Sequence, residues 1–343
     1  MTATYVLGPM KRCRAILFMG ACLLAVACGR GDAPSQNIRD PEPDKVSLRL
    51  QWFPLAQFAG FYVAADKGFY RDDRLDVTVN PGGPDFNAIT LVANGSDQFG
   101  IWTADQILAA RSRGVPITVV AAIYRKDPNV LMVRNGSGIK GPADFVGKTV
   151  TTVFGRATET VLRGMLARAN VDPNRVRIEP FPFNVQSFVA GKVDVSAAYV
   201  YDHPFQARRM GTEVDLIDPA DYGMNFYSDC LFVRTDLIEQ RPDLVQRFVS
   251  ATLRGWEYAL AHQGEAVDIV MTKTQGIDRE SQEYMLRESE ALIRHENPDR
   301  LGLISLDSLN QMKAVLLEQK QLDHDIDVRE AFTNRFVDAY YGR

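Results

Sequence analysis

The sequence predicts an α/β protein with two lobes, each built on a sheet flanked by helices. Short apolar runs of strand character alternate along the chain with longer runs in which apolar residues recur every three or four positions. Glycine or proline stands between most of these runs, as is typical at the ends of strands and helices. Residues 28–343, 316 in all, are too many for one ordinary core and suit two.

The first 27 residues have the features of a signal peptide. Three basic residues, Lys11, Arg12 and Arg14, precede the apolar run 15–27, which is short for a bilayer span. A start at Met10 in place of Met1 would put this basic cluster at the amino terminus. Ala25-Val26-Ala27 forms a cleavage site directly before Cys28.

Residues 28–44 are rich in Gly, Pro, Asp and Ser and have no apolar period. This composition predicts a flexible tether between the cleavage site and the folded lobes.

Charge and cysteine content exclude several classes of protein. Loss of residues 1–27 removes three basic and no acidic residues, so the net charge moves from −4 to −7. An acidic chain is unlike a nucleic-acid binder. Two of the four cysteines lie in the leader, and Cys28 and Cys230 remain. A disulfide within the mature monomer and a cysteine metal cluster are therefore not expected.

In the first lobe, strand and helix patterns alternate in order. A strand beginning at Ser47 shows the two-residue period and ends before Pro54, which cannot donate to a ladder. The other strands expected here are 76–79, 98–102 and 117–124. The helices expected here are 58–65, 86–94 and 103–113, with Gly68 and Gly95 as stop signals and Thr103 as an N-cap.

Several aromatic residues lie where an expected strand ends and the next expected helix begins. Trp52 and Trp102 both stand at the carboxyl end of an expected strand, and Phe58 and Phe61 follow Trp52 on the same turn. Ligands of open α/β sheets bind beyond the carboxyl ends of strands. Each aromatic residue alone could equally be core. As a set they favour a stacking pocket, beside which Thr103 could offer its hydroxyl and nearby N–H groups.

The second lobe shows the same order of patterns. Its strands are expected at 129–134, 148–154, 176–179 and 193–201, with crossings between lobes near Val133 and Asp229. Gly155, Arg156 and Thr158 open a helix and could form an anion or carbonyl site, or a simple capping turn.

Tyr199, Tyr201 and Asp202 follow another strand and could hydrogen-bond a ring with donor and acceptor edges. Asn225 and Phe226 lie where the chain returns to the first lobe. From Leu237 onward the pattern is helical, and the spacing around Trp256 predicts that this tryptophan is core.

One stretch carries a family resemblance. Residues 52–70 read W-F-P-x-x-Q-F-A-G-F-Y-V-A-x-x-K-G-F-Y, and the likeness continues through Pro81-Gly82-Gly83-Pro84, Phe99–Trp102 and Gly191–Asp194. The chain resembles bacterial solute-binding proteins for thiamine-pyrimidine precursors and riboflavin. These are relatives of the alkanesulfonate, taurine and nitrate binders of ABC importers.

The resemblance implies a two-lobed periplasmic binding protein of type II with a ligand cleft between its lobes. Lobe I would comprise 45–133 and 230–343, and lobe II 134–229. Cys28 would be acylated, so that the protein is periplasmic or at the cell surface and held on the membrane. An ABC permease and ATPase would be its partners, and it would be a monomer with no cofactor and no nucleic-acid partner.

The function that follows is the capture of a planar aromatic heterocycle, either a thiamine pyrimidine precursor or a riboflavin-like molecule, by closure of the lobes. The alternative is a small oxyanion such as an alkanesulfonate, taurine or nitrate. A ligand-sensing lipoprotein would use the same fold. The expected ligand contacts are Trp52, Gln57, Phe58, Phe61, Trp102, Thr103, Phe154, Arg156, Tyr199, Tyr201, Asp202, Asn225 and Phe226.

Enzymatic activity is not expected. In the eukaryotic relatives that make the thiamine pyrimidine with iron, the essential histidine aligns with Phe58 here, and their cysteine cluster has no counterpart. The four histidines show no HExxH spacing, and no GxSxG is present.

Overall fold

The computed structural model describes residues 42–342, which contain two five-stranded sheets. The predicted leader, Cys28 and nearly all of the predicted tether lie outside these residues. No helix within 42–342 combines the length and the hydropathy that a bilayer crossing needs.

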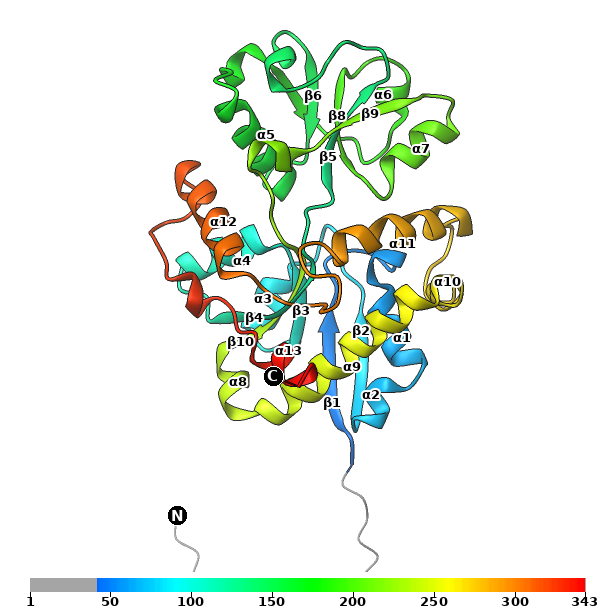
Figure 1. Cartoon of the computed structure of the whole chain (residues 1–343), viewed down its shortest axis with the longest axis vertical. Helices are drawn as coiled ribbons and strands as arrows, with labels where there is room; N and C mark the ends of the chain where they lie inside the picture. The colour runs from blue at the N-terminus through cyan, green and yellow to red at the C-terminus, as the bar shows by residue number, and fades with distance from the viewer. Residues whose placement is uncertain (1–41, 343) are drawn as a thin grey trace, which may run out of the picture. The chain divides into compact units, whose positions relative to one another are not determined.

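The first sheet has the strand order β2-β1-β3-β10-β4 (Figure 1). Strands β1, β2 and β3 are parallel, and β10 runs antiparallel between β3 and β4. The bounds are Asp44–Arg49 (β1), Leu75–Asn80 (β2), Phe99–Trp102 (β3), Ile117–Tyr124 (β4) and Ser228–Arg234 (β10).

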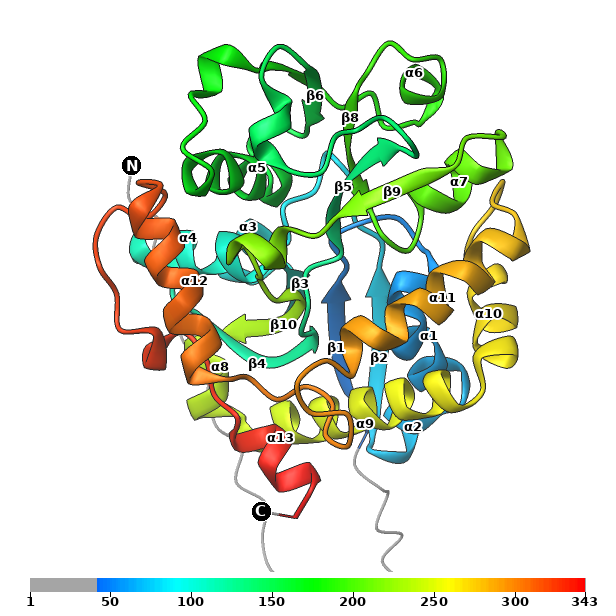
Figure 2. The same cartoon turned by 45° about the horizontal axis from the view of Figure 1, so that its top comes forward.

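Helices cover both faces of this sheet (Figure 2). On β3, Phe99 and Ile101 belong to one apolar core and Trp102 to the other, because successive side chains of a strand point to opposite faces. The first core includes residues of α1 (Ala59–Asp66), α9 (Pro242–Ala261), α10 (Gln263–Met271) and α11 (Arg279–Ile293). The second includes residues of α3 (Ala88–Ala93), α4 (Ala104–Ser112) and α12 (Leu306–Glu318).

The predicted core role of Trp256 is confirmed. The side chain is fully buried and its ring meets Phe61 edge to face, with centroids 5.7 Å apart. Helices α1 and α9 approach closely here, since a Cβ on Gly60 would lie 2.2 Å from the Trp256 ring. Glycine is therefore required at this crossing.

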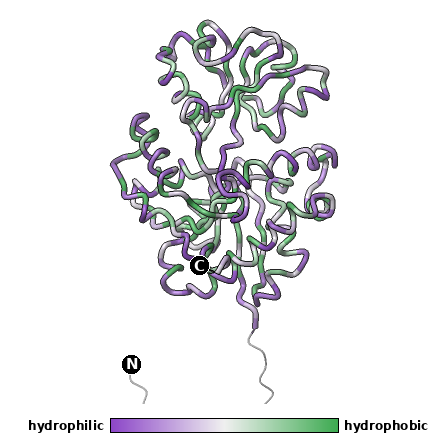
Figure 3. The backbone as a smooth tube through the Cα atoms, in the orientation of Figure 1, coloured by the Kyte–Doolittle hydropathy of each residue, from purple (hydrophilic) through white to green (hydrophobic). Residues whose placement is uncertain are grey.

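The second sheet has the order β7-β6-β8-β5-β9. Its strands are β5 (Asn129–Arg134), β6 (Thr149–Thr152), β7 (Arg177–Pro180), β8 (Val195–Tyr199) and β9 (Val214–Ile217). Helix α5 packs on one face, and α6 and α7 pack on the other; their bounds are Ala157–Arg168, Gln186–Val189 and His203–Arg209. Hydrophobic segments follow the strands of both sheets (Figure 3).

The first crossing between the sheets differs from the predicted one, whereas the second agrees with the predicted return through Asn225 and Phe226. The whole of β5 pairs with β8 and β9, so the first crossing is 125–128 and not near Val133. The second is 223–227, and Asp229 already belongs to β10 of the first sheet. The apolar run of β5 suits either sheet, which is why the sequence did not place it. Asn225 Oδ1 accepts from the Asp127 N–H at 3.2 Å and so links the crossings.

Shorter elements complete the described chain. They are η1 (Ala56–Phe58), α2 (Phe69–Asp72), η2 (Pro142–Phe145), η3 (Pro173–Arg175), η4 (Pro219–Tyr222), α8 (Thr235–Gln240), η5 (Val328–Glu330) and α13 (Arg335–Tyr340).

Candidate functional site

A cavity of about 230 Å³ lies between the two sheets and is lined from both. Its lining residues follow the carboxyl ends of parallel strands: Trp52 after β1, Trp102 at the end of β3, Arg156 after β6 and Tyr199 at the end of β8. This is the edge at which α/β sheets bind ligands. The arrangement therefore places a cleft between the lobes, as the sequence predicts.

Aromatic rings from both lobes line the cavity: Trp52 forms part of the first-lobe wall, and Phe183, Tyr199 and Tyr201 form part of the second-lobe wall. Trp52 of the first lobe stacks on Phe183 of the second, with ring centroids 6.2 Å apart and an interplanar angle of 18°. On the second lobe, Tyr199 and Tyr201 stack with centroids 5.7 Å apart at 19°. Phe183 is 63% exposed, so its ring offers free surface. Flat faces of this kind suit a planar aromatic ligand.

Arg156 is the one lysine or arginine among the described residues that line the cavity. It stands at the N-cap of α5, and its guanidinium carbon lies 5.1 Å from the centre of the Trp102 ring. Because Arg156 and Trp102 come from different lobes, this cation–π contact joins them.

A buried carboxylate supports the first-lobe wall. Gln57 Nε2 lies 3.0 Å from both carboxylate oxygens of Asp229, and Gln51 Nε2 donates to Oδ1. Burial raises the pKa of Asp229 to about 8 despite these two donors. Tyr124 donates to the Gln57 carbonyl at 3.2 Å and so fixes the same segment.

Further acidic groups lie at the crossing end of the cavity. Burial raises the pKa of Asp127 to about 7 and also raises that of Asp105, in the first turn of α4. Burial raises the pKa of Tyr199 as well, and the nearby charge of Asp127 adds to that effect. Burial therefore favours the neutral form of these groups.

His203 is held as a neutral, structural ring. Its Nδ1 accepts from the Tyr199 N–H at 2.9 Å, and Phe181 meets the ring edge to face at 5.1 Å. Burial lowers the pKa of His203. Within residues 42–342, no three His, Cys, Asp or Glu side chains gather as a metal site would require.

The cavity brings together eight of the thirteen predicted contact residues. They are Trp52, Gln57, Trp102, Thr103, Arg156, Tyr199, Tyr201 and Asp202. Trp52 lies in the turn after β1 and not within the strand, because β1 ends at Arg49.

The other five predicted residues are not among those that line the cavity, and we correct their placement. Phe58 and Phe61 are fully buried in the first core, because η1 and α1 turn both rings inward. Phe226 is buried in the second core. Phe154 is 49% exposed, and the Asn225 side chain is bound to the Asp127 N–H.

Several lining residues were missed by the sequence reasoning. They include Gln51, Asn129, Phe181, Phe183, His203 and Ser228. Phe181 and Phe183 follow β7, so the strand-end rule applied to Trp52 would have found them. Asn129 begins a strand, and no pattern in the sequence marks it.

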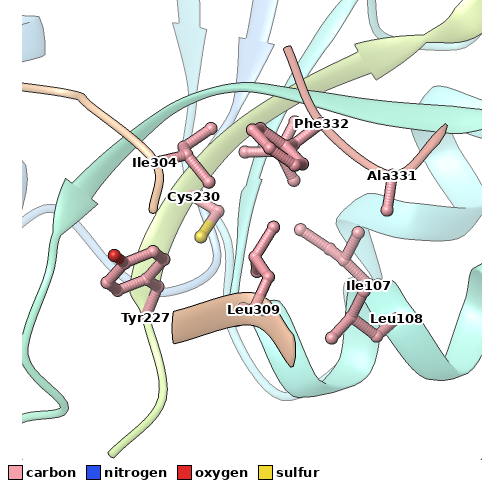
Figure 4. Close-up of a pocket in the computed structure, with 10 residues that line it drawn as sticks. Ile107, Leu108, Tyr227, Cys230, Ile304, Leu309, Ala331 and Phe332 are labelled. Atoms are coloured by element: carbon pink, nitrogen blue, oxygen red, sulfur yellow. The ribbon is translucent and has the colours of Figure 1, made fainter. Parts of the chain in front are cut away.

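A second, much smaller cavity lies within the first lobe (Figure 4). Its volume is about 10 Å³, and Cys230 projects into it between Tyr227 and Leu309. Its lining is almost wholly apolar, and its volume is that of a single water at most. It is a packing defect and not a ligand site.

The fold and the cleft define the two-lobed architecture of periplasmic binding proteins, with the candidate ligand site where its sheets meet. Residues 55–266 match the family described as NMT1/THI5 like, and the chain belongs to this family.

Curated relatives include binding proteins and enzymes. The chain is 29% identical to the riboflavin-binding protein RibY of Chloroflexus aurantiacus, over 89% of each chain. It is 26% identical to the formylaminopyrimidine-binding protein of Halalkalibacterium halodurans, over 77% of this chain and 79% of that one. It is also 24% identical to the 4-amino-5-hydroxymethyl-2-methylpyrimidine phosphate synthase of Legionella pneumophila, over 85% and 92%.

Solved structures share the fold. The periplasmic aliphatic sulphonate binding protein SsuA of Escherichia coli superimposes with a TM-score of 0.66 at 16% identity, covering 85% of this chain and 92% of that one. Identity at this level shows the common periplasmic binding protein architecture alone.

Proposed function

We propose that this protein is the ligand-capturing subunit of an ABC importer, and that it binds a planar aromatic heterocycle between its lobes. The observation that carries the proposal is a set of aromatic rings, Trp52 on the first lobe and Phe183, Tyr199 and Tyr201 on the second, that line one cavity. The relatives named for riboflavin and formylaminopyrimidine support this ligand class. Both named molecules have flat rings with polar edges.

Closure of the lobes would complete the site. Contacts between lobes already lie on both sides of the cleft: Phe205 stacks on Tyr284 with centroids 4.9 Å apart, and Thr160 donates to Gln321 at 2.9 Å. A ring held between the walls would add contacts with both lobes and so favour the closed arrangement. A permease would then recognise the closed form.

Location and attachment belong to the same proposal. After cleavage at Ala27, an acylated Cys28 would hold the protein on the outer side of the membrane, and residues 28–43 would give it reach. The mass of the mature protein purified from membranes tests this. A Cys28→Ser variant recovered in the soluble fraction would support the anchor.

The proposal is tested by titration. Purified mature protein is titrated with riboflavin, thiamine, hydroxymethylpyrimidine, formylaminopyrimidine and taurine, and tryptophan fluorescence is followed. We expect saturable quenching by one of the heterocycles and none by taurine, because Arg156 is the single lysine or arginine among the described lining residues that could face a sulfonate. Saturable tight binding of taurine alone would replace this ligand class with the oxyanion alternative.

Two variants show whether the tryptophans make the site. We expect Trp52→Leu to weaken binding by about 1–3 kcal/mol, roughly 5- to 150-fold, because stacking on its indole is lost. Trp102→Leu should weaken binding as well, because it removes the ring against which Arg156 is held. Phe154→Leu is the matched control, since Phe154 is exposed on the second lobe and is not among the lining residues. Equal affinities in all three variants would contradict a stacking site.

The relatives named as synthases raise a second candidate, an enzyme that makes the pyrimidine. In this chain Phe58 stands at the position of their essential histidine by resemblance, and it is buried away from the cavity. We therefore propose binding without turnover. Release of pyrimidine product by the protein with iron and pyridoxal phosphate would overturn that part.

A further inference from the structure

Asn129 carries a buried acceptor that nothing in residues 42–342 satisfies. The residue borders the cavity at the start of β5 and is only 4% exposed. Its Nδ2 donates to Asp127 Oδ1 at 2.5 Å, but no donor reaches its own Oδ1. An unpaired buried carbonyl is costly and rare, so its partner is expected from what fills the cavity.

Asp127 fixes which end of the Asn129 amide is free. Asp127 Oδ1 accepts from the Asn129 backbone N–H at 2.9 Å as well as from its Nδ2. A carboxylate oxygen that already accepts a backbone bond would repel the amide oxygen. The amide is therefore held with Nδ2 toward Asp127 and Oδ1 away from it.

The strand register places Asn129 on the aromatic wall. It pairs with Tyr199 of the antiparallel strand β8, and directly opposite residues project from the same face of a sheet. Both residues line the cavity, so the Asn129 side chain lies at the edge of the wall that contains Tyr199 and Tyr201.

A second acceptor without a donor lies at the same end. Asp105 Oδ1 is buried and unpaired, and Asp105 stands in α4 beside Thr103 and Gln106, which line the cavity. The charge of Asp105 acts on Asp127, so the two groups are close. Two buried oxygens without a donor, Asn129 Oδ1 and Asp105 Oδ1, therefore lie on or beside residues that line the cavity.

We infer that Asn129 is a specificity-determining residue whose Oδ1 accepts a hydrogen bond from an N–H at the edge of the ligand ring, and that Asp127 is a positioning residue that holds the amide in this orientation. The inference rests on the proposed function and narrows the class of ligand to rings that carry an N–H at one edge. Rings with an imide or amino group at one edge fit; rings alkylated there leave the oxygen unpaired.

The test compares ligands that differ at that N–H alone. Riboflavin is paired with 3-methylriboflavin, and hydroxymethylpyrimidine with its 4-dimethylamino counterpart, each titrated against the full mature protein. For the pair that binds, we expect the wild type to prefer the N–H ligand by about tenfold or more, because the alkylated one leaves the acceptor unpaired. In Asn129→Ala the preference should fall below about threefold, since the acceptor is gone and the methyl groups have room.

Two more variants separate recognition from folding. Asp127→Asn frees the Asn129 amide to turn, so the preference should fall there too; a purely structural role would weaken both ligands of a pair equally. Asn135→Ala, at the far end of β5 with its Nδ2 on Asp215, should keep the wild-type ratio. Thermal unfolding of every variant shows whether it is folded.

The outcomes separate the inference from the proposed function. Tight binding of a heterocycle with no preference within its pair, or an unchanged preference in Asn129→Ala, overturns the inference and leaves the proposed function standing. Failure of the wild type to bind any heterocycle overturns both.

Discussion

The two walls of the cavity are built differently. The first-lobe wall is supported from behind: Gln57 and Gln51 hold Asp229, Tyr124 holds the Gln57 carbonyl, and Phe58 is buried beneath them. The side-chain amides of Gln51 and Gln57 are therefore already paired within the protein.

The second-lobe wall keeps free groups at its surface. Phe183 is largely exposed, Tyr199 is partly exposed, and the Asn129 oxygen has no donor among residues 42–342. The contrast indicates that the first lobe presents a preformed platform and the second supplies groups that a ligand completes. Changes behind the first wall should therefore alter stability, and changes on the second should alter binding.

The largest effect is expected from Phe58→Ala. Removal of a fully buried phenyl ring from the first core should lower the free energy of unfolding by about 3–5 kcal/mol, because the cavity left behind cannot fully collapse. Urea denaturation measures it. Phe154→Ala on the second lobe is the matched control and should change stability by about 0.5 kcal/mol or less, since that ring is half exposed. A loss in Phe58→Ala no larger than that in Phe154→Ala would show that Phe58 does not support the first-lobe wall.

The sequence predicts most of this fold for a simple physical reason. Strand and helix periods depend on local alternation of apolar residues, and β3, β4 and α9 follow them closely. The first crossing was less predictable, because the apolar run of β5 fits either sheet and only long-range pairing with β8 decides between them.

The site was predictable only where it follows strand ends. Trp52, Trp102, Tyr199 and Tyr201 were found by that rule. Phe58 and Phe61 were expected beside them, but a helical turn carries them into the core, which strand-end position alone does not reveal. Asn129 is singled out because its Oδ1 has no hydrogen-bond donor among residues 42–342, and a sequence does not show which hydrogen bonds are made.

A smaller effect on stability should depend on pH. The folded pKa of Asp229 is about 8, whereas an unfolded Asp titrates near 3.9. Between about pH 4 and 8, unfolding therefore releases a proton, and stability falls as pH rises through that window by at most about 1.4 kcal/mol per pH unit. Asp127 adds a slope of the same sign, which ends near pH 7.

Asp229→Asn keeps an acceptor for Gln57 but cannot ionise, so it should remove the fall between pH 7 and 8. Urea midpoints at pH 6, 7, 8 and 9 measure this. Asp76→Asn, an exposed change on β2, should keep the wild-type profile. A wild type equally stable at pH 7 and 8 would show that Asp229 is already ionised in the folded state.

The smallest effect is expected on the second wall, from Phe183→Ala. Loss of the ring that stacks on Trp52 should weaken binding of the heterocycle that the wild-type protein binds. The expected loss is about 0.5–1.5 kcal/mol, roughly 2- to 12-fold. Stability should be unchanged, because most of the ring is in solvent. Fluorescence titration beside urea denaturation gives both values, and Phe154→Ala, of similar exposure on the same lobe, should alter neither. A stability loss in Phe183→Ala at unchanged affinity would mean that this ring holds the lobes together and does not receive the ligand. The second wall would then contribute to stability, as the first one does.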